Sequence, residues 1–196
     1  MKKIFANCYD YFMNPIEKRY ITRWRRKLLS HAEGRVLEIG VGTGINFPLY
    51  KHCTEVDAIE PNPYMIDKAE VRKNQASVPI NLIESRAEHL PFASGTFDTV
   101  VVTLVLCSVD HPKQVLREIN RVLKPNGRVL ILEHVKMEKS FLAGLQEVLT
   151  PIWKQLCDGC HLNRDTESLV KEEFTIVSRK TYLSSLAISL IAMKQQ

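Results

Sequence analysis

A short apolar strand that runs into three alternating glycines constrains this chain more than any other feature. The apolar run before Gly40 contains one acid, Glu38, and Gly42 and Gly44 follow at alternate positions. Glycine is needed where a ligand touches backbone that a Cβ would block. Glu60 ends a second apolar strand twenty residues after Gly40, where an acid can accept both hydroxyls of a ribose. The pattern predicts a nucleoside cofactor lying across the carboxyl ends of parallel strands.

The spacing of the glycines distinguishes two kinds of cofactor. The dinucleotide-binding fingerprint is G-x-G-x-x-G, whereas residues 40–44 read G-x-G-x-G. The tighter bend suits a ligand that carries a carboxylate and a sulfonium better than one that carries a pyrophosphate. A nicotinamide dinucleotide is the alternative ligand.

The remaining pattern predicts alternating strands and helices, and therefore a mostly parallel sheet covered on both faces. Val100, Val101 and Val102 are apolar on consecutive positions, as in a strand buried on both faces. Strands are expected at 35–41, 55–60, 79–84, 97–104, 127–134, 174–182 and 186–193, and helices at 7–32, 46–51, 63–75, 111–123 and 139–157. The turn residues Pro125, Asn126 and Gly127 are expected to end the helix before them.

The net charge of +5 is concentrated at one end of the chain. Residues 1–34 hold eight bases and three acids, and this excess equals the charge of the whole chain. A nucleic-acid enzyme more often carries a basic face across its domain, so no nucleic-acid partner is expected. The basic helix either contacts an anionic membrane peripherally or is a solvated face. Since no export signal or membrane-spanning run is visible, we expect a cytoplasmic protein.

Cysteine usage indicates reduced thiols and no metal. The five cysteines include Cys157 and Cys160 in a C-x-x-C-H pattern, which is typical of covalent haem attachment. Haem attachment requires export, and disulfides are rare in a reducing compartment. A zinc site needs further ligands at metal spacing, and His161 alone lies nearby in the sequence. We therefore predict no metal site.

Later segments identify the fold family by resemblance. Together with the E-x-G-x-G-x-G stretch, the segments 87–92 (AEHLPF), 95–98 (GTFD) and 123–128 (LKPNGR) resemble landmarks of the class I S-adenosylmethionine-dependent methyltransferases over roughly residues 30–135. The resemblance implies a Rossmann-like, seven-stranded, mostly parallel doubly wound sheet with helices on both faces and a final antiparallel pair. It also implies a helical lid at 1–34 and a cofactor-binding domain at 35–196, together forming one compact unit.

A narrower resemblance suggests the methyl acceptor. The segments 103–109 (TLVLCSV), 133–135 (EHV) and 151–166, which contains D-G-C-x-L-x-R, resemble the methyltransferase-like seven family, whose animal members methylate alkyl thiols. The A-E-x-L-P-F stretch is equally compatible with quinone-precursor C-methyltransferases and phospholipid N-methyltransferases. A cofactor-binding module without chemistry is a further alternative. A nucleic-acid methyltransferase would more often show an N-P-P-Y-like loop where residues 103–106 read Thr-Leu-Val-Leu.

The class I resemblance implies S-adenosylmethionine as cofactor, S-adenosylhomocysteine as product, and a set of cofactor contacts. Glu38 orients the glycine loop, the three glycines allow close approach, and Glu60 binds the ribose. The remaining contacts are expected from Pro61 and Met65 beside the adenine, Ala87 and Glu88 at its edge, and Leu104 and Val105 closing over the donor. Arg86 occupies the place of an acid that often binds the adenine amine, so that contact is in doubt.

The acceptor is expected between the lid and the segment 151–166, with Tyr9 and Tyr11 on one wall and Trp153 and Cys160 on the other. A thiol acceptor must lose its proton, because the thiolate is the nucleophile. His134 is the predicted base, since it ends the fifth strand, where strand ends face the ligand crevice. Asp158 is the alternative base.

Overall fold

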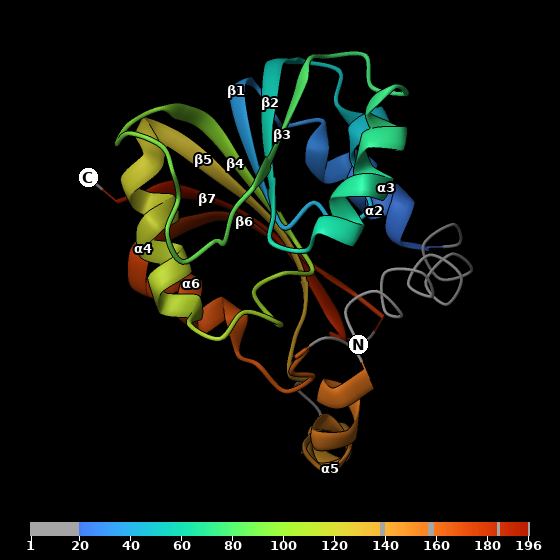
Figure 1. Cartoon of the computed structure of the whole chain (residues 1–196). Coiled ribbons are helices and arrows are strands. Elements are labelled where there is room, and N and C mark those ends of the chain that lie inside the picture. Colours follow the sequence, from blue (N-terminus) through green and yellow to red (C-terminus); the bar gives the residue numbers. More distant parts are fainter. Residues whose placement is uncertain (1–19, 138–139, 157–158, 184, 196) are drawn as a thin grey trace.

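The computed structural model describes residues 20–137, 140–156, 159–183 and 185–195 (Figure 1). Within these residues, seven strands form one sheet in the order β3-β2-β1-β4-β5-β7-β6. The strands are β1 (Gly34–Ile39), β2 (Cys53–Glu60), β3 (Ile80–Glu84), β4 (Phe97–Thr103), β5 (Leu123–His134), β6 (Phe174–Tyr182) and β7 (Ala187–Lys194). All seven predicted strands are therefore present.

Strand direction determines where a ligand can bind. The pairs β1–β2, β1–β4, β2–β3 and β4–β5 are parallel, and β7 runs antiparallel to both β5 and β6. This confirms the predicted mostly parallel sheet with a final antiparallel pair. The order reverses at β1, and the strand ends at Ile39, Glu60, Thr103 and His134 consequently meet at one edge. Ligands bind at such a switch point in open α/β sheets.

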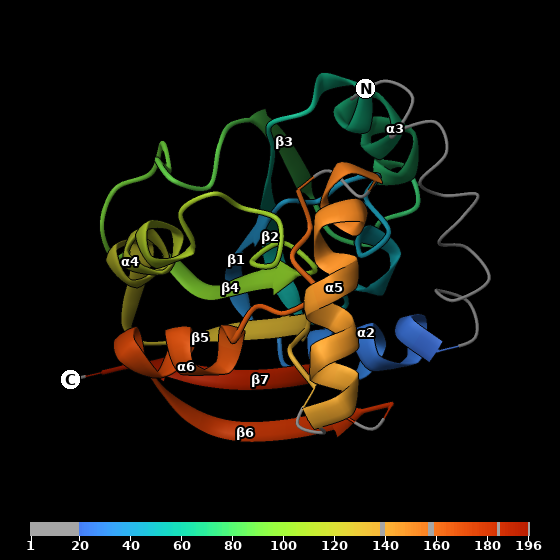
Figure 2. The same ribbon diagram turned by 90° about the horizontal axis from the view of Figure 1, so that it is seen from below.

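Helices cover both faces of the sheet (Figures 1 and 2). The helices α2 (Thr22–Leu29) and α3 (Pro63–Lys73) lie with the short 3₁₀ helix η2 (Phe47–Leu49) on one face, and α4 (Pro112–Val122) and α6 (Thr166–Glu173) lie on the other. The helix α5 (Ser140–Leu156) crosses the carboxyl-terminal edge of the parallel strands. It is fixed there by Gln146, whose Nε2 donates to the carbonyls of Val135 at 3.1 Å and Leu162 at 3.0 Å.

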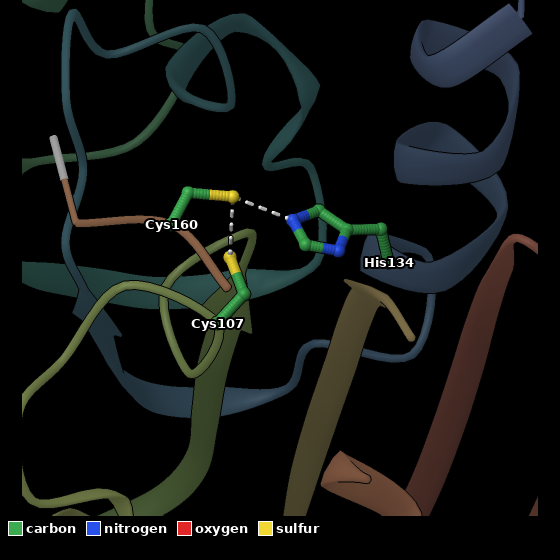
Figure 3. A group of neighbouring side chains, drawn as sticks. All are labelled: Cys107, His134 and Cys160. Atoms are coloured by element: carbon green, nitrogen blue, oxygen red, sulfur yellow. Dashed lines mark hydrogen bonds between the residues drawn. The ribbon is translucent and has the colours of Figure 1, made fainter. Parts of the chain in front are cut away.

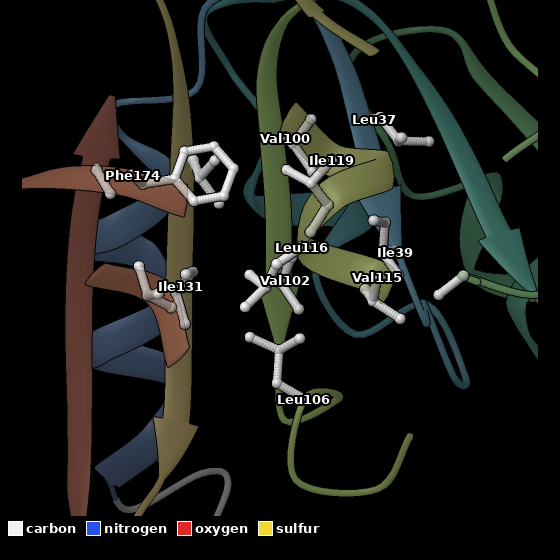
Figure 4. Packing of buried hydrophobic residues seen from close by; sticks show 14 of the residues in the cluster. Leu37, Ile39, Val100, Val102, Leu106, Val115, Leu116, Ile119, Ile131 and Phe174 are labelled. Atoms are coloured by element: carbon white, nitrogen blue, oxygen red, sulfur yellow. The ribbon is translucent and has the colours of Figure 1, made fainter. Parts of the chain in front are cut away.

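The periodicity of α4 explains how the sheet is covered. Pro112 occupies the first turn, where its missing N–H costs no hydrogen bond. Val115, Leu116 and Ile119 then fall on one side of the helix and are buried against the sheet (Figure 4). Burying each such side chain contributes roughly 1.5–3 kcal/mol. A second apolar core fills the opposite face, so the sheet is buried on both sides, as the run of valines in β4 predicted.

Two helical predictions differ from the structure. The helix expected at 46–51 is only the single 3₁₀ turn η2, because the backbone becomes extended at Tyr50 and β2 begins at Cys53. Conversely, α6 was not predicted, although its start carries a cap. Asp165 Oδ1 accepts from Ser168 N at 3.1 Å, which is a standard signal for a helix N-terminus.

The turn at Pro125–Gly127 lies inside a strand instead of before it. Helix α4 ends at Val122 and β5 begins at once, with Asn126 in the left-handed region at φ +64°. The pairing of β4 with β5 shifts register across this turn, so the three residues form an irregularity in the strand.

Part of the predicted N-terminal helix is visible as α2, and residues 1–19 lie outside the described residues. Leu28 and Leu29 of α2 are buried, and Trp24 stacks on Tyr182 with ring centroids 4.3 Å apart. In the described part of the chain, no helix combines the length and apolar character that a bilayer crossing demands.

Candidate active site

Two glycines of the loop after β1 are required by the packing of the loop itself. The N–H groups of Gly40 and Val41 donate to the carbonyl of Ile59 at 2.9 and 3.1 Å, which fastens the loop to β2. A Cβ on Gly40 would lie 2.5 Å from Val105 Cγ2, and one on Gly44 would lie 2.7 Å from the Phe47 ring. The loop is therefore drawn tightly against the β4 end and η2.

Gly42 differs from its two neighbours, because a Cβ there would meet no atom within 4 Å. Its N–H donates to Glu60 Oε2 at 3.0 Å, while Glu60 Oε1 accepts from Asn62 N at 3.0 Å. The open side of the glycine loop and the carboxylate at the end of β2 are thus adjacent. This arrangement fits a nucleoside whose sugar hydroxyls meet Glu60 and whose remaining part lies against the Gly42 backbone.

Glu38 is the centre of a buried polar network below the loop. Its two carboxylate oxygens accept from Asn46 Nδ2 at 2.7 Å and from the Tyr50 hydroxyl at 2.8 Å. Arg25 of α2 donates to Asn46 Oδ1 at 3.1 Å and to Thr103 Oγ1 at 2.7 Å. Burial raises the pKa of Glu38 to about 7, despite these bonds and the nearby Arg25 charge. The network joins α2, β1, β4 and the glycine loop.

The residues expected around the adenine lie at the ends of β2 and β3. Met65 is buried near the start of α3, and Pro61 is exposed. Ala87 and Glu88 are both buried in the loop after β3. Arg86 Nε lies 3.5 Å from Glu88 Oε2. Glu88, the acid that could bind the adenine amine in this loop, is therefore paired with Arg86.

The loop after β4 is held by a buried acid that the sequence analysis did not single out. Leu104 adopts a positive φ of 60°, and the following N–H groups of Val105 and Leu106 donate to Glu133 Oε1 at 2.7 and 2.8 Å. Glu133 is fully buried on β5, and burial raises its pKa. One carboxylate oxygen thereby fixes the backbone at Val105 and Leu106, in the loop that was expected to cover the donor.

Next to this loop, three side chains from distant parts of the sequence converge (Figure 3). Cys107 follows β4, His134 ends β5 and Cys160 lies between α5 and α6; we call these residues the thiol cluster. His134 Nε2 lies 2.8 Å from Cys160 Sγ, and the two sulfurs are 3.8 Å apart. Both cysteines are buried and His134 is partly buried.

The electrostatics of the thiol cluster favour a thiolate on Cys160. The hydrogen bond from Cys107 and the bonding and charge of His134 lower the pKa of Cys160 to about 4, against the opposing effect of burial. Burial lowers the pKa of His134, but the contact with Cys160 outweighs it and the pKa is raised. The hydrogen bond with Cys160 and burial raise the pKa of the Cys107 thiol well above its ordinary value.

The segment that carries Cys160 is clamped to the loop after β4. His161 N donates to the Cys107 carbonyl at 2.8 Å. Arg164 Nη1 donates to the carbonyls of Leu106 and Val109, the latter at 2.8 Å. Trp153 also hydrogen-bonds to the Cys160 sulfur. The arginine of the D-G-C-x-L-x-R segment therefore holds the loop that carries Cys107.

The structure brings some of the predicted site residues together, whereas others lie outside the described residues. His134, Cys160 and Trp153 form one group, while Gly42 and Glu60 form another along the same edge of the sheet. Asp158, Tyr9 and Tyr11 lie outside the described residues. Cys107, Glu133 and Arg164 were not predicted as site residues, although all three lie in segments that carry the narrower resemblance.

Comparisons with known proteins decide the family. A model described as a methyltransferase domain matches residues 37–131. The human thiol S-methyltransferase TMT1B is 33% identical over 177 residues, which cover 81% of this chain and 72% of that protein. The chain belongs to the class I S-adenosylmethionine-dependent methyltransferases. The rat TMT1B is 38% identical over 74% of this chain, which spans 62% of that relative.

Solved methyltransferases share the fold over nearly the whole chain. A Thermotoga maritima methyltransferase, described as a possible histamine N-methyltransferase, superposes with a TM-score of 0.72 at 22% identity, covering 98% of this chain and 97% of the other. The N-methyltransferase NodS from Bradyrhizobium japonicum, in complex with S-adenosylhomocysteine, has a TM-score of 0.68 at 20% identity, covering 92% and 87%. These likenesses show a shared fold, and the family match shows that the chain carries an S-adenosylmethionine-dependent methyltransferase domain.

Proposed function

We propose that this methyltransferase transfers a methyl group to the sulfur of a small alkyl thiol. The observation that carries the proposal is the thiol cluster of Cys107, His134 and Cys160 beside the loop that covers the donor. The names of the human and rat relatives support it, since both are thiol S-methyltransferases. The residues of the cluster lie in the segments 103–109, 133–135 and 151–166, whose sequences resemble that family.

The reaction requires the protein mainly to align the reactants and to exclude water from them. S-adenosylmethionine supplies an already activated methyl group on a sulfonium, so transfer is an in-line displacement. Holding nucleophile and methyl in line can contribute roughly 7–11 kcal/mol. We assign donor placement to the Gly42 backbone and to Glu60, with Glu38 fixing the loop beneath. We keep Pro61, Met65, Ala87, Glu88, Leu104 and Val105 as the proposed lining of the donor.

Acceptor activation is assigned to the opposite end of the crevice. An alkyl thiol with a pKa near ~8.5 is mostly protonated at neutral pH, and only the thiolate attacks efficiently. His134 and Cys160 are in contact at 2.8 Å, and this is where we place removal of the thiol proton. Trp153, which contacts Cys160 and is partly exposed, is the proposed apolar wall for the alkyl group. Tyr9, Tyr11 and Asp158 remain proposals from the sequence.

An acceptor panel with radiolabelled S-adenosylmethionine tests the proposal. The full chain is offered small alkyl thiols, quinol precursors and phosphatidylethanolamine vesicles in separate reactions. We expect label in the thioether product, with the rate rising as the alkyl chain lengthens. Label found only in lipid would favour an activity like that of the Cereibacter sphaeroides phosphatidylethanolamine N-methyltransferase, which is 35% identical over 64% of this chain. Either lipid-only or quinol-only labelling would contradict a thiol acceptor.

A further inference from the structure

We propose that the thiol cluster is a zinc site with three protein ligands, Cys107, His134 and Cys160, and one open position for the acceptor thiol. Binding of zinc by these three side chains follows from the geometry of the cluster, whereas the catalytic role of the ion rests on the proposed thiol acceptor. The sequence predicts no metal because the neighbours of Cys160 along the chain do not complete a site. The fold supplies the missing ligands from the ends of β4 and β5.

The distances fit a tetrahedral ion after a small adjustment. One potential ligand atom from each residue lies within 4.8 Å of the other two. The two sulfurs are 3.8 Å apart, and two thiolates at about 2.3 Å from a tetrahedral zinc are separated by about 3.8 Å. His134 Nε2 is 2.8 Å from Cys160 Sγ, and would move out to about 3.5 Å around the same ion.

The donor set selects the kind of metal. Two thiolates and one imidazole are soft or borderline ligands, which suit Zn²⁺ and exclude Mg²⁺ and Ca²⁺, whose ligands are oxygens. Structural zinc sites are closed by four protein ligands, whereas sites with three protein ligands keep a position for water or substrate. Within the described residues, these three are the only such group of potential ligands. The site therefore has the composition of a catalytic zinc centre.

The surroundings hold the ligands where an ion needs them. Glu133 fixes the backbone just before Cys107 through Leu106 N at 2.8 Å. His161 N and Arg164 clamp the same loop to the segment of Cys160. Ligands held in this way need little reorganisation when an ion binds, and such supporting contacts tune metal affinity.

The ion would convert the acceptor into its nucleophilic form. With the ion bound, His134 and Cys160 act as its ligands and the metal takes over the role of the base: a thiol that takes the open position binds as thiolate and loses its proton to water. The thiolate lone pair then forms the new sulfur–carbon bond, while the bond from the methyl carbon to the sulfonium sulfur breaks and its electron pair stays on that sulfur. The products are a thioether and S-adenosylhomocysteine. A neutral thioether is a weak ligand, so it leaves the ion readily.

Cobalt substitution tests the site directly. The full chain is purified with a reductant, stripped with a chelator and titrated with Co²⁺. We expect one Co²⁺ per chain, with thiolate-to-cobalt charge-transfer absorption that one equivalent of Zn²⁺ abolishes. Cys107→Ser and Cys160→Ser should each weaken Co²⁺ binding at least tenfold and reduce this absorption. Cys53→Ser is the matched control, because Cys53 is also buried but lies outside the cluster, and it should bind as the wild type does.

A second measurement does not depend on whether the variants fold. X-ray absorption of the zinc-loaded wild type should give two sulfur ligands and one imidazole nitrogen. Absence of charge-transfer absorption in the wild type, or one sulfur or none around zinc, would overturn the proposal. S-adenosylhomocysteine binding by calorimetry identifies the variants that are folded.

Activity separates this inference from the proposed function. We expect the stripped enzyme to lose at least tenfold in thiol methylation and to recover when Zn²⁺ is restored. Undiminished methylation by the stripped enzyme would refute the zinc role and leave the thiol acceptor standing. Zinc binding through both cysteines without methylation of any thiol would refute the acceptor and leave the metal site standing.

Discussion

Gly42 has a backbone φ of +55°, and no atom lies within 4 Å of the place where its Cβ would be. We expect Gly42→Val to lower the affinity for S-adenosylhomocysteine at least tenfold by calorimetry, because the side chain would enter the space assigned to the cofactor. Gly95→Val is a matched control, since Gly95 also has a positive φ of +65° with open space, but precedes β4 at the opposite edge of the sheet. Equal loss of affinity in both variants would show that backbone strain, and not the site, is responsible.

The buried carboxyl of Glu38 predicts a pH dependence of stability. Its pKa is about 7 in the folded protein against an ordinary 4.5, because of burial. The folded state therefore binds this proton more tightly than the unfolded state does. The resulting stabilisation is fully present below about pH 4.5 and is lost as the pH rises through 7.

Glu38→Gln removes this titration while keeping an acceptor for Asn46. We expect the free energy of unfolding of the wild type, relative to that of Glu38→Gln, to fall by roughly 3 kcal/mol between pH 4.5 and 8. Urea unfolding of both proteins across this range measures the difference. Parallel curves for the two proteins would contradict the raised pKa.

At the scale of elements, one carboxylate of β5 holds the loop that follows β4. Glu133 Oε1 accepts from two N–H groups, at Val105 and Leu106. Glu133→Ala leaves both donors without a partner and should cost about 2–4 kcal/mol of unfolding free energy. Glu133→Gln keeps an oxygen in place and should cost much less, so denaturant unfolding that ranks the two variants equally would disprove this role.

The same elements show what a sequence pattern can and cannot predict. Apolar runs bounded by turn residues predicted every strand to within a few residues, because burial on both faces leaves a continuous signal. Helix α6 was missed, since its short amphipathic stretch follows a loop and only the Asp165 cap marks its start. The helix expected at 46–51 was wrong because the chain turns extended at Tyr50 and enters β2 at Cys53, which leaves room for one turn only.

The two halves of the candidate site also differ in how far the sequence predicts them. The proposed donor half is centred on one contiguous stretch, residues 38–44, together with Glu60, so the spacing of these residues was enough to propose it. The acceptor half joins Cys107 and Cys160, which are 53 residues apart in sequence and 3.8 Å apart in space. No periodicity links such positions, and only the fold brings them together.

For the whole molecule, cofactor binding should raise the stability of the fold. A ligand that binds only the folded state adds about 2.7 kcal/mol at a hundred times its Kd. For a chain of this length we expect S-adenosylhomocysteine to raise Tm by about 5–10 °C. Nicotinamide dinucleotides should leave Tm unchanged, because the G-x-G-x-G loop and its contacts do not match their fingerprint. A dinucleotide shift without one from S-adenosylhomocysteine would contradict the donor site.

The position of β7 governs the order in which this sheet can be completed. It lies between β5 and β6, pairing His134 with Ala187 on one side and Phe174 with Lys194 on the other. Although β6 precedes β7 in the chain, it pairs with no other strand and joins the sheet only through β7. The edge of β5 therefore stays open until β7 is in place, and a chain truncated near residue 183 would be prone to bind other unpaired strands.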